Sequence, residues 1–223
     1  MTDINVLKHL LKTRYSCRAF RPDPVPKETI EQIVEAARHV PSWCNAQPWH
    51  VTLTQPDATD RFRAGLAEVV ANDAPELDLT GPDTYPGVYG DRRRTCGWQL
   101  YEAVGVQKGD RQASGAQMMR NFVLFDAPHV AIVSSPKALG GYGAMDTGGF
   151  VTAFALAARA LGVDTIAQAA IASYADFVRK HFDIGEDRMV LCAISFGYAV
   201  DDHAANSFRT ERASLDEILD WHQ

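Results

Sequence analysis

Two segments are the most informative about the function of this chain: RYSCR at residues 14–18 and PSWCNAQPW at residues 41–49. The first carries two permanently charged guanidinium groups and a hydroxyl, which suit the recognition of a phosphate. The second is a polar loop closed by Pro-Trp, in which Ser42, Asn45 and Gln47 can hydrogen-bond to a flat heterocycle. Together the two segments predict a site for a phosphorylated cofactor.

The composition limits the classes of protein to consider. The chain has 223 residues, of which 46% are hydrophobic and 22% charged, as is ordinary for one soluble globular domain. Its 22 basic and 28 acidic residues give a net charge of −6, which argues against nucleic acid or an anionic membrane as the main partner. No apolar run approaches the roughly 20 residues that cross a bilayer, and no secretory signal begins the chain. We therefore expect a single cytoplasmic domain over residues 1–223.

Metal-binding and Rossmann-type nucleotide patterns are absent from the sequence. The four cysteines are widely spaced and include no C-x-x-C pair: Cys17, Cys44, Cys96 and Cys192. We expect reduced thiols and, since the seven histidines share no ligand-like spacing, no bound metal. The glycine-rich segment at residues 140–143 lacks the G-x-G-x-x-G spacing of a dinucleotide fingerprint.

Hydrophobic periodicity predicts helices and strands without a regular βαβ rhythm. Helical spacing of apolar residues predicts helices over residues 4–11, 27–39, 57–70, 145–161 and 174–182. Short apolar runs predict strands over residues 51–54, 130–133, 163–167 and 189–196. This order favours an α+β fold over a doubly wound sheet.

Two long segments fall outside these elements. Residues 71–115 form an excursion or lid, which is rich in Pro and Gly over residues 71–91 and is expected to be irregular there. Its aromatic residues could stack on a substrate ring, although aromatics at loop tips also anchor loops. The aromatic residues considered for substrate binding are Tyr85, Tyr89, Trp98 and Tyr101. Residues 200–223 are expected to form an extended C-terminal arm.

Three motifs together resemble those of the FMN-dependent nitroreductase family. They are Arg14-x-Ser16-x-Arg18-x-Phe20, Pro41-Ser42-x-x-Asn45-x-Gln47-Pro48-Trp49 and Asn206-x-x-Arg209-x-x-Arg212. The middle of the chain is similar to the longer branch of that family, which includes reductases of nitrobenzoates and dinitroaniline-type compounds. The resemblance implies an α+β fold with a mostly antiparallel central sheet. It also implies an intertwined homodimer with exchanged C-terminal arms and an FMN site at each subunit interface.

The resemblance assigns roles around the phosphate and the flavin ring. Arg14, with Arg209 and Arg212, is expected to meet the phosphate; exposed ion pairs with Glu211 and Asp216 are the alternative for the last two. Arg18 is expected beside N1 and O2 of the ring, where positive charge stabilises the reduced flavin. Ser16, next to Tyr15 in the same binding segment, is expected near the ribityl–pyrimidine end.

Two further segments are expected to complete the cofactor site. The partner subunit would supply loop residues that border the flavin: Pro41, Ser42, Trp43, Asn45 and Gln47. The segment Gln168, Ala169 and Ala170 would pass over the flavin, with the Ala169 backbone near N5; an acidic residue and a glycine occupy the last two positions in several relatives. Residues 92–94, three successive arginines, either attract the phosphates of NADPH or form a solvated face.

The resemblance implies an oxidoreductase that uses FMN and takes electrons from NADPH or NADH. A small, flat, electron-poor aromatic acceptor such as a nitroarene would then be reduced in a ping-pong reaction, without a side-chain nucleophile. Other reactions on the same scaffold are quinone or enoate reduction, reductive dehalogenation and breakdown of the flavin itself. A non-catalytic flavin-binding redox sensor is the alternative outside enzymes. The sequence names neither the acceptor nor the preferred nicotinamide nucleotide, nor does it decide between one- and two-electron reduction.

Overall fold

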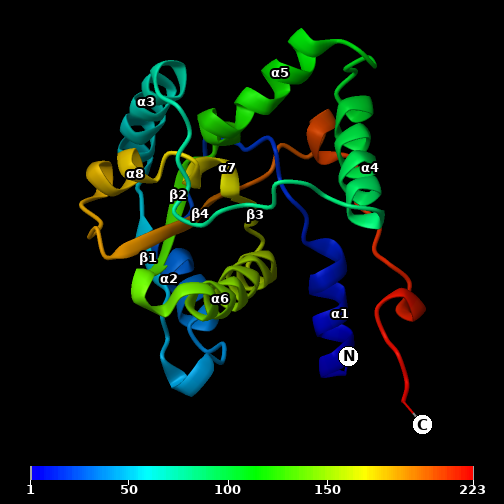
Figure 1. The fold of residues 1–223 in the computed structure, drawn as a ribbon, viewed down its shortest axis with the longest axis horizontal. Coiled ribbons are helices and arrows are strands. Elements are labelled where there is room, and N and C mark those ends of the chain that lie inside the picture. Colours follow the sequence, from blue (N-terminus) through cyan, green and yellow to red (C-terminus); the bar gives the residue numbers. More distant parts are fainter. Residues whose placement is uncertain (1, 223) are drawn as a thin grey trace.

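The centre of the molecule is an antiparallel β-sheet. The computed structural model describes residues 2–222, and over these residues the sheet has four strands. The strands are β1 (His50–Leu53), β2 (His129–Pro136), β3 (Asp164–Gln168) and β4 (Arg188–Gly197). Their order is β1-β2-β4-β3, and each neighbouring pair is antiparallel. The predicted α+β class and antiparallel sheet are confirmed (Figure 1).

Helices precede, connect and cover these strands. The α-helices are α1 (Asp3–Thr13), α2 (Lys27–Ala37), α3 (Pro56–Asn72), α4 (Val88–Ala103), α5 (Arg111–Met119), α6 (Gly140–Ala160), α7 (Ala169–Ala172) and α8 (Ala175–Phe182). Short 3₁₀ helices are η1 (Trp43–Asn45), η2 (Arg120–Asp126), η3 (Lys137–Leu139), η4 (Ala204–Asn206) and η5 (Leu215–Glu217). Each helix and strand predicted from periodicity is present with shifted ends; α6, for example, begins five residues before the predicted start at 145.

The sheet is covered on both faces, which makes two hydrophobic cores. Helices α2 and α6 pack on one face, and α3 and α8 pack on the other (Figure 1). Side chains of β2 alternate between these cores: Ala131 and Val133 join the first, whereas Val130 and Ile132 join the second. Because both faces are buried, β2 reads as a continuous apolar run rather than as an alternating one.

The excursion over residues 71–115 contains two helices that periodicity did not predict. Irregular backbone was expected through residue 91, but α4 already begins at Val88, after Gly87 with a φ of 52°. Gly90 is the one buried residue of α4, and α5 buries none among its described residues. Neither helix therefore carries the apolar stripe by which an amphipathic helix is recognised in a sequence.

The irregular part of the excursion is fixed to the rest of the fold by a buried ion pair. The guanidinium of Arg179 on α8 is 4% exposed and bonds to the carboxylates of Asp78 and Asp176. Asp78 also accepts a hydrogen bond of 2.8 Å from the amide of Val190 on β4. The chain leading into α4 is thus held at the edge of the second core.

His129, the first residue of β2, is buried and held in one tautomer. Its Nε2 accepts a hydrogen bond of 2.9 Å from the amide of Val25, so the ring proton lies on Nδ1 and is donated to the carbonyl of Thr54 at 2.9 Å. Burial lowers the pKa of this imidazole below its usual 6.5. The folded state therefore resists protonation of His129, whereas the unfolded chain does not.

We expect the free energy of unfolding to fall as the pH drops below about 6.5, because the unfolded chain then binds a proton that folded His129 resists. His129→Gln should lower stability at pH 8 by about 1–3 kcal/mol, through loss of a buried hydrogen bond. It should also reduce the pH-dependent loss, with the remainder due to His181, whose pKa burial also lowers. Urea unfolding between pH 8 and 5.5 measures both effects. If the free energy of unfolding depends equally on pH in the parent protein and in His129→Gln, this role of His129 is wrong.

Candidate functional site

The end of α1, helix α4 and the C-terminal segment enclose a strongly cationic cavity of about 470 Å³, here called the arginine cavity. Figure 1 shows these three parts of the chain side by side. The lining residues are Leu11, Lys12, Arg14, Tyr15, Ser16, Arg18, Cys96, Phe208, Arg209, Thr210 and Arg212. They include four arginines and one lysine but no carboxylate. Burial and then the charge of Arg212 lower the pKa of Arg14. A cavity of this kind attracts anions.

Asn206 joins the C-terminal segment to the N-terminal motif. Its side-chain oxygen accepts a hydrogen bond of 2.7 Å from the amide of Arg18, and its amide nitrogen donates to the carbonyls of Ala19 and Val200, at 3.0 Å each. Asn206 is 4% exposed, so these bonds are sheltered from water. The two motifs, almost 190 residues apart, are held together within one chain.

The two C-terminal arginines are oriented by neighbours inside the cavity. The guanidinium carbon of Arg209 lies 3.7 Å from the centroid of the Tyr15 ring, and its Nη1 donates to the carbonyl of Asn206 at 2.8 Å. The Nη1 of Arg212 donates to the hydroxyl of Thr210 at 2.8 Å. Over residues 2–222 neither arginine forms an ion pair with a carboxylate, so the exposed ion pairs considered as an alternative are not found.

A second cavity of about 300 Å³, here called the Gln168 cavity, shares Ser16 and Arg18 with the arginine cavity. Its other lining residues are Leu100, Tyr101, Gln117, Met118, Asn121, Phe125, Ile166, Ala167, Gln168 and Ala169. Arg18 lies between the two cavities, where its Nη1 donates to the Ser16 carbonyl at 3.0 Å. Burial lowers the pKa of its guanidinium. Cys17 is turned into the core, where burial raises the pKa of the thiol to about 12.

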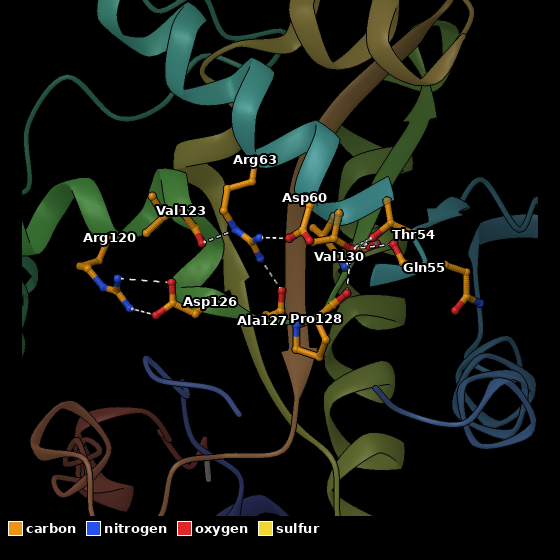
Figure 2. A network of polar contacts seen from close by, with 11 residues as sticks. Thr54, Gln55, Asp60, Arg63, Arg120, Val123, Asp126, Ala127, Pro128 and Val130 are labelled. Carbon is orange, nitrogen blue, oxygen red and sulfur yellow. Dashed lines mark hydrogen bonds and ion pairs between the residues drawn. The ribbon is translucent and has the colours of Figure 1, made fainter. Parts of the chain in front are cut away.

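Strained backbone places Phe125 at the wall of the Gln168 cavity. Leu124, Phe125 and Asp126 all have φ between 51° and 63°, a region that costs non-glycine residues about 1–3 kcal/mol each. Arg63 on α3 donates to the carbonyls on both sides of this turn, to Val123 at 3.0 Å and to Ala127 at 2.7 Å (Figure 2). These bonds satisfy the displaced carbonyls and keep the turn in place.

The segment at the end of β3 lies along the Gln168 cavity. The Gln168 side chain is buried: its oxygen accepts a hydrogen bond of 2.5 Å from Ser195, and its nitrogen donates to the carbonyl of Asn121 at 2.9 Å. Ala169, which begins α7, lines the cavity, whereas Ala170 does not. The first amides of a helix have no acceptor within the helix, so the backbone there can bind a ligand.

The loop at residues 41–49 lines neither cavity of its own chain. Its conformation is nevertheless fixed at three points. The amide of Trp43 donates to Asp146 on α6 at 3.1 Å, and the amide of Gln47 donates to the Ser42 hydroxyl at 2.9 Å. Arg188 Nη2, which lies 2.9 Å from the carbonyl of Ser134, donates to the Pro48 carbonyl at 3.0 Å.

Three non-glycine residues of this loop have left-handed backbone. They are Cys44, Asn45 and Gln47, with φ of 52°, 56° and 49°. Trp43 is 56% exposed and makes an edge-on contact with Tyr142 at 4.2 Å between ring centroids, while Asn45 and Gln47 are also exposed. A strained loop that presents polar groups and an indole away from its own core is typical of a functional element.

Of the four aromatic residues considered for substrate binding, Tyr101 lines the Gln168 cavity and the other three do not. Tyr85 and Tyr89 line a separate groove with Arg92 and Arg93, and Trp98 lies in a shallow cavity on another face of α4. Residues of α4 and α5 line the Gln168 cavity instead. Of these, Leu100, Gln117 and Met118 were given no binding role from the sequence, nor was Cys96 in the arginine cavity, whereas Tyr101 was considered for stacking on a substrate. Correct prediction of α4 would have revealed the shared face of Cys96 and Leu100.

The described residues contain neither a candidate metal site nor a candidate membrane-spanning helix. Over residues 2–222, no group of three or more His, Cys, Asp or Glu side chains could hold a metal ion. In the same part of the chain, none of the helices has the length and apolar character required to cross a bilayer.

The sheet, its two helical layers and the linked cationic cavities define the class of protein as an oxidoreductase of the nitroreductase type. The model of the Nitroreductase family matches residues 11–198, and this chain belongs to that family. Among curated proteins it is 36% identical over 211 residues to Nitroreductase NfnB of Mycolicibacterium smegmatis, covering 94% of this chain and 90% of that protein. It is 29% identical over 222 residues to 4-nitrobenzoate reductase of Nocardioides sp., covering 96% and 88%.

Solved structures agree with this assignment over the whole fold. The FMN-dependent nitroreductase NfnB from Mycobacterium smegmatis in complex with NADPH superposes with a TM-score of 0.94 at 34% identity, covering 99% of both chains. The FMN and NADPH-dependent nitroreductase NfnB from Sphigopyxis sp. strain HMH gives a TM-score of 0.91 at 26% identity, covering 97% of this chain and 98% of that one. The resemblance drawn from the sequence motifs is confirmed.

Proposed function

We propose that this chain is an FMN-dependent oxidoreductase that takes electrons from NADPH or NADH and passes them to flat, electron-poor acceptors such as nitroaromatics. One observation carries the proposal: a cavity lined by four arginines and no carboxylate joins a second cavity through Ser16 and Arg18. A ligand with a phosphate at one end and a ring at the other matches that arrangement. The relatives named as FMN- and NADPH-dependent support the same reading.

The residues of the arginine cavity fit a phosphate dianion. Arg14, Arg209 and Arg212 line one cavity, and the pKa of Arg14 is lowered mainly by burial and further by repulsion from the charge of Arg212. A bound dianion would offset that repulsion and form charge-assisted hydrogen bonds, which are stronger than neutral ones. Tyr15 would act indirectly, because its ring packs against the Arg209 guanidinium.

The residues of the Gln168 cavity fit the isoalloxazine ring. Arg18 would face the pyrimidine edge, where a buried positive charge stabilises negative charge that develops there. The hydroxyl of Ser16 and the backbone at Ala169 would supply hydrogen bonds, while the Gln168 side chain holds this segment against Asn121 and Ser195. Phe125 and Met118 provide apolar contacts on the wall.

FMN, when bound, would accept a hydride at N5 from the nicotinamide nucleotide and pass it to the acceptor in a ping-pong cycle. The protein would bind the cofactor, orient the reactants and stabilise the charge that develops on the flavin ring. No carboxylate or imidazole is among the residues that line the Gln168 cavity, so water would supply the protons. Arg18 would carry the electrostatic part of the catalysis, since it is partly buried and lines both cavities.

A homodimer would complete the site. The loop at residues 41–47 is fixed in shape but lines neither cavity of its own chain, so it would border the cofactor of a partner. Several elements also leave large apolar side chains uncovered, an arrangement that marks interaction surfaces. Examples are Leu7 on α1, Met145 on α6 and Trp221 in the C-terminal arm, which are 45%, 63% and 83% exposed. The arm at residues 213–222 would then lie across the partner.

The purified protein should be yellow and should lose this colour without oxygen on adding NADPH or NADH, because the bound flavin is reduced. Addition of a nitroarene such as 4-nitrobenzoate should restore the colour. Absorbance at the flavin band, followed anaerobically, measures both steps. Failure to bind FMN on reconstitution would contradict the proposal, and bleaching without reoxidation by any nitroarene, quinone or enoate would favour a redox sensor.

Arg14 and Arg18 should have separable effects. Arg14→Ala should weaken FMN binding by about 10–100-fold, which corresponds to the roughly 1.5–3 kcal/mol of a hydrogen bond to a charged group. Arg18→Ala should in addition slow flavin reduction at saturating FMN. Flavin fluorescence titration and anaerobic stopped-flow reduction measure the two quantities. Arg38→Ala is the matched control, since Arg38, which directly follows α2, is exposed and paired with Glu35. Parent-like binding and reduction in both variants would disprove these roles.

The chain should sediment as a dimer of its 24.5 kDa subunit. Gly148 on α6 is exposed, and a Cβ there would meet no atom within 4 Å of its own chain. Gly148→Arg should therefore spare the subunit fold but shift the dimer toward monomer and lower FMN retention. Gly115→Arg on α5 is the control, because a Cβ at Gly115 also meets no atom within 4 Å. A monomeric parent protein, measured by analytical ultracentrifugation, would refute the dimer.

A further inference from the structure

Helix α4 connects the two cavities to a third concave surface. Arg93, Cys96 and Leu100 are spaced by three and four residues, so they share one face of the helix. Cys96 lines the arginine cavity and Leu100 lines the Gln168 cavity. Arg93 lines a groove of about 590 Å³, here called the Tyr85 groove. At about 1.5 Å of rise per residue, Arg93 lies roughly 10 Å along the helix from Leu100.

The three successive arginines of α4 have different partners. Arg94 pairs with Asp91 on its own helix, and Arg92 pairs with Glu217 of the C-terminal segment at 2.8 Å. Over residues 2–222, no carboxylate lies within 4.0 Å of the Arg93 guanidinium. Its guanidinium carbon instead lies 5.3 Å from the centroid of the Tyr85 ring. Of the three positive charges, that of Arg93 is the one left without an opposite charge.

The Tyr85 groove joins this charge to an aromatic surface. Its other lining residues are Pro82, Thr84, Tyr85, Pro86, Tyr89 and Arg92. Tyr85 and Tyr89 are 49% and 61% exposed, so their rings are open to a ligand. A Cβ at Gly90 would lie 2.5 Å from the Tyr85 carbonyl, so the backbone of α4 at Gly90 packs closely against Tyr85. Such a surface can stack a purine ring while a guanidinium binds an adjacent phosphate.

NADPH differs from NADH by one phosphate on the adenosine ribose. If the nicotinamide reaches the Gln168 cavity, the remainder of the nucleotide can extend along the α4 face that carries Leu100, Cys96 and Arg93. We propose that Arg93 binds the 2′-phosphate of NADPH while Tyr85 and Tyr89 stack with its adenine, which makes the enzyme selective for NADPH. This inference rests on the proposed function, since it requires a nicotinamide nucleotide as the reductant.

The test uses the FMN-loaded protein and two probes that lack the nicotinamide: adenosine 2′,5′-bisphosphate and adenosine 5′-monophosphate. Calorimetric titration should give at least tenfold tighter binding of the bisphosphate to the parent protein. Arg93→Gln should remove that difference, whereas Arg94→Gln should keep it, since Arg94 is paired with Asp91 and lies outside the Tyr85 groove. Tyr85→Leu should weaken both probes without changing their ratio.

Steady-state kinetics supply a second readout. The ratio of kcat/KM for NADPH to that for NADH should fall at least tenfold in Arg93→Gln and stay at the parent value in Arg94→Gln. Equal binding of the two probes to the parent protein, or parent-like ratios in a folded, FMN-loaded Arg93→Gln variant, would overturn the inference. If neither nucleotide reduces the flavin, the proposed function fails instead, and the titration still decides whether the Tyr85 groove binds a 2′-phosphate.

Discussion

The concentration of four guanidinium groups in one cavity is the constraint on which this site depends. Arg14, Arg18, Arg209 and Arg212 line one cavity without a carboxylate to offset their charge. Asn206 holds the two ends of the chain together there through three hydrogen bonds to backbone groups. The fold thus stabilises an arrangement of charge that is unfavourable by itself and that an anionic ligand would relieve.

Arginines also support the irregular backbone around the site. Arg63 donates to the carbonyls that flank the left-handed turn at Leu124–Asp126, and Arg188 donates to the carbonyl of Pro48 at the end of the strained loop. Arg179 fixes Asp78 in the segment that leads to α4. In each case a planar group with several donors satisfies backbone or carboxylate oxygens that regular secondary structure leaves free.

Much of the fold could be predicted from periodicity, because most elements bury one face. Strand β2 and helices α2 and α8 agree with their predicted positions to within a few residues. Helices α4 and α5 were not predicted, because almost none of their residues is buried within their own chain. The binding roles of Cys96, Leu100 and Gln117, which line the two cavities, were missed for the same reason. A helix that lines an open cavity rather than a core does not carry the apolar pattern that periodicity detects.

The sequence by itself determined the family and placed the arginines in short motifs, because residue type and local spacing decide which groups a segment can offer to a phosphate. It also grouped Arg92, Arg93 and Arg94 as one basic triplet. Only the tertiary structure decided that Arg92 and Arg94 are paired while Arg93 faces an aromatic groove. It likewise showed the loop at residues 41–49 lining neither cavity of its own chain. Such relations depend on which distant segments meet, and local spacing carries no information about that.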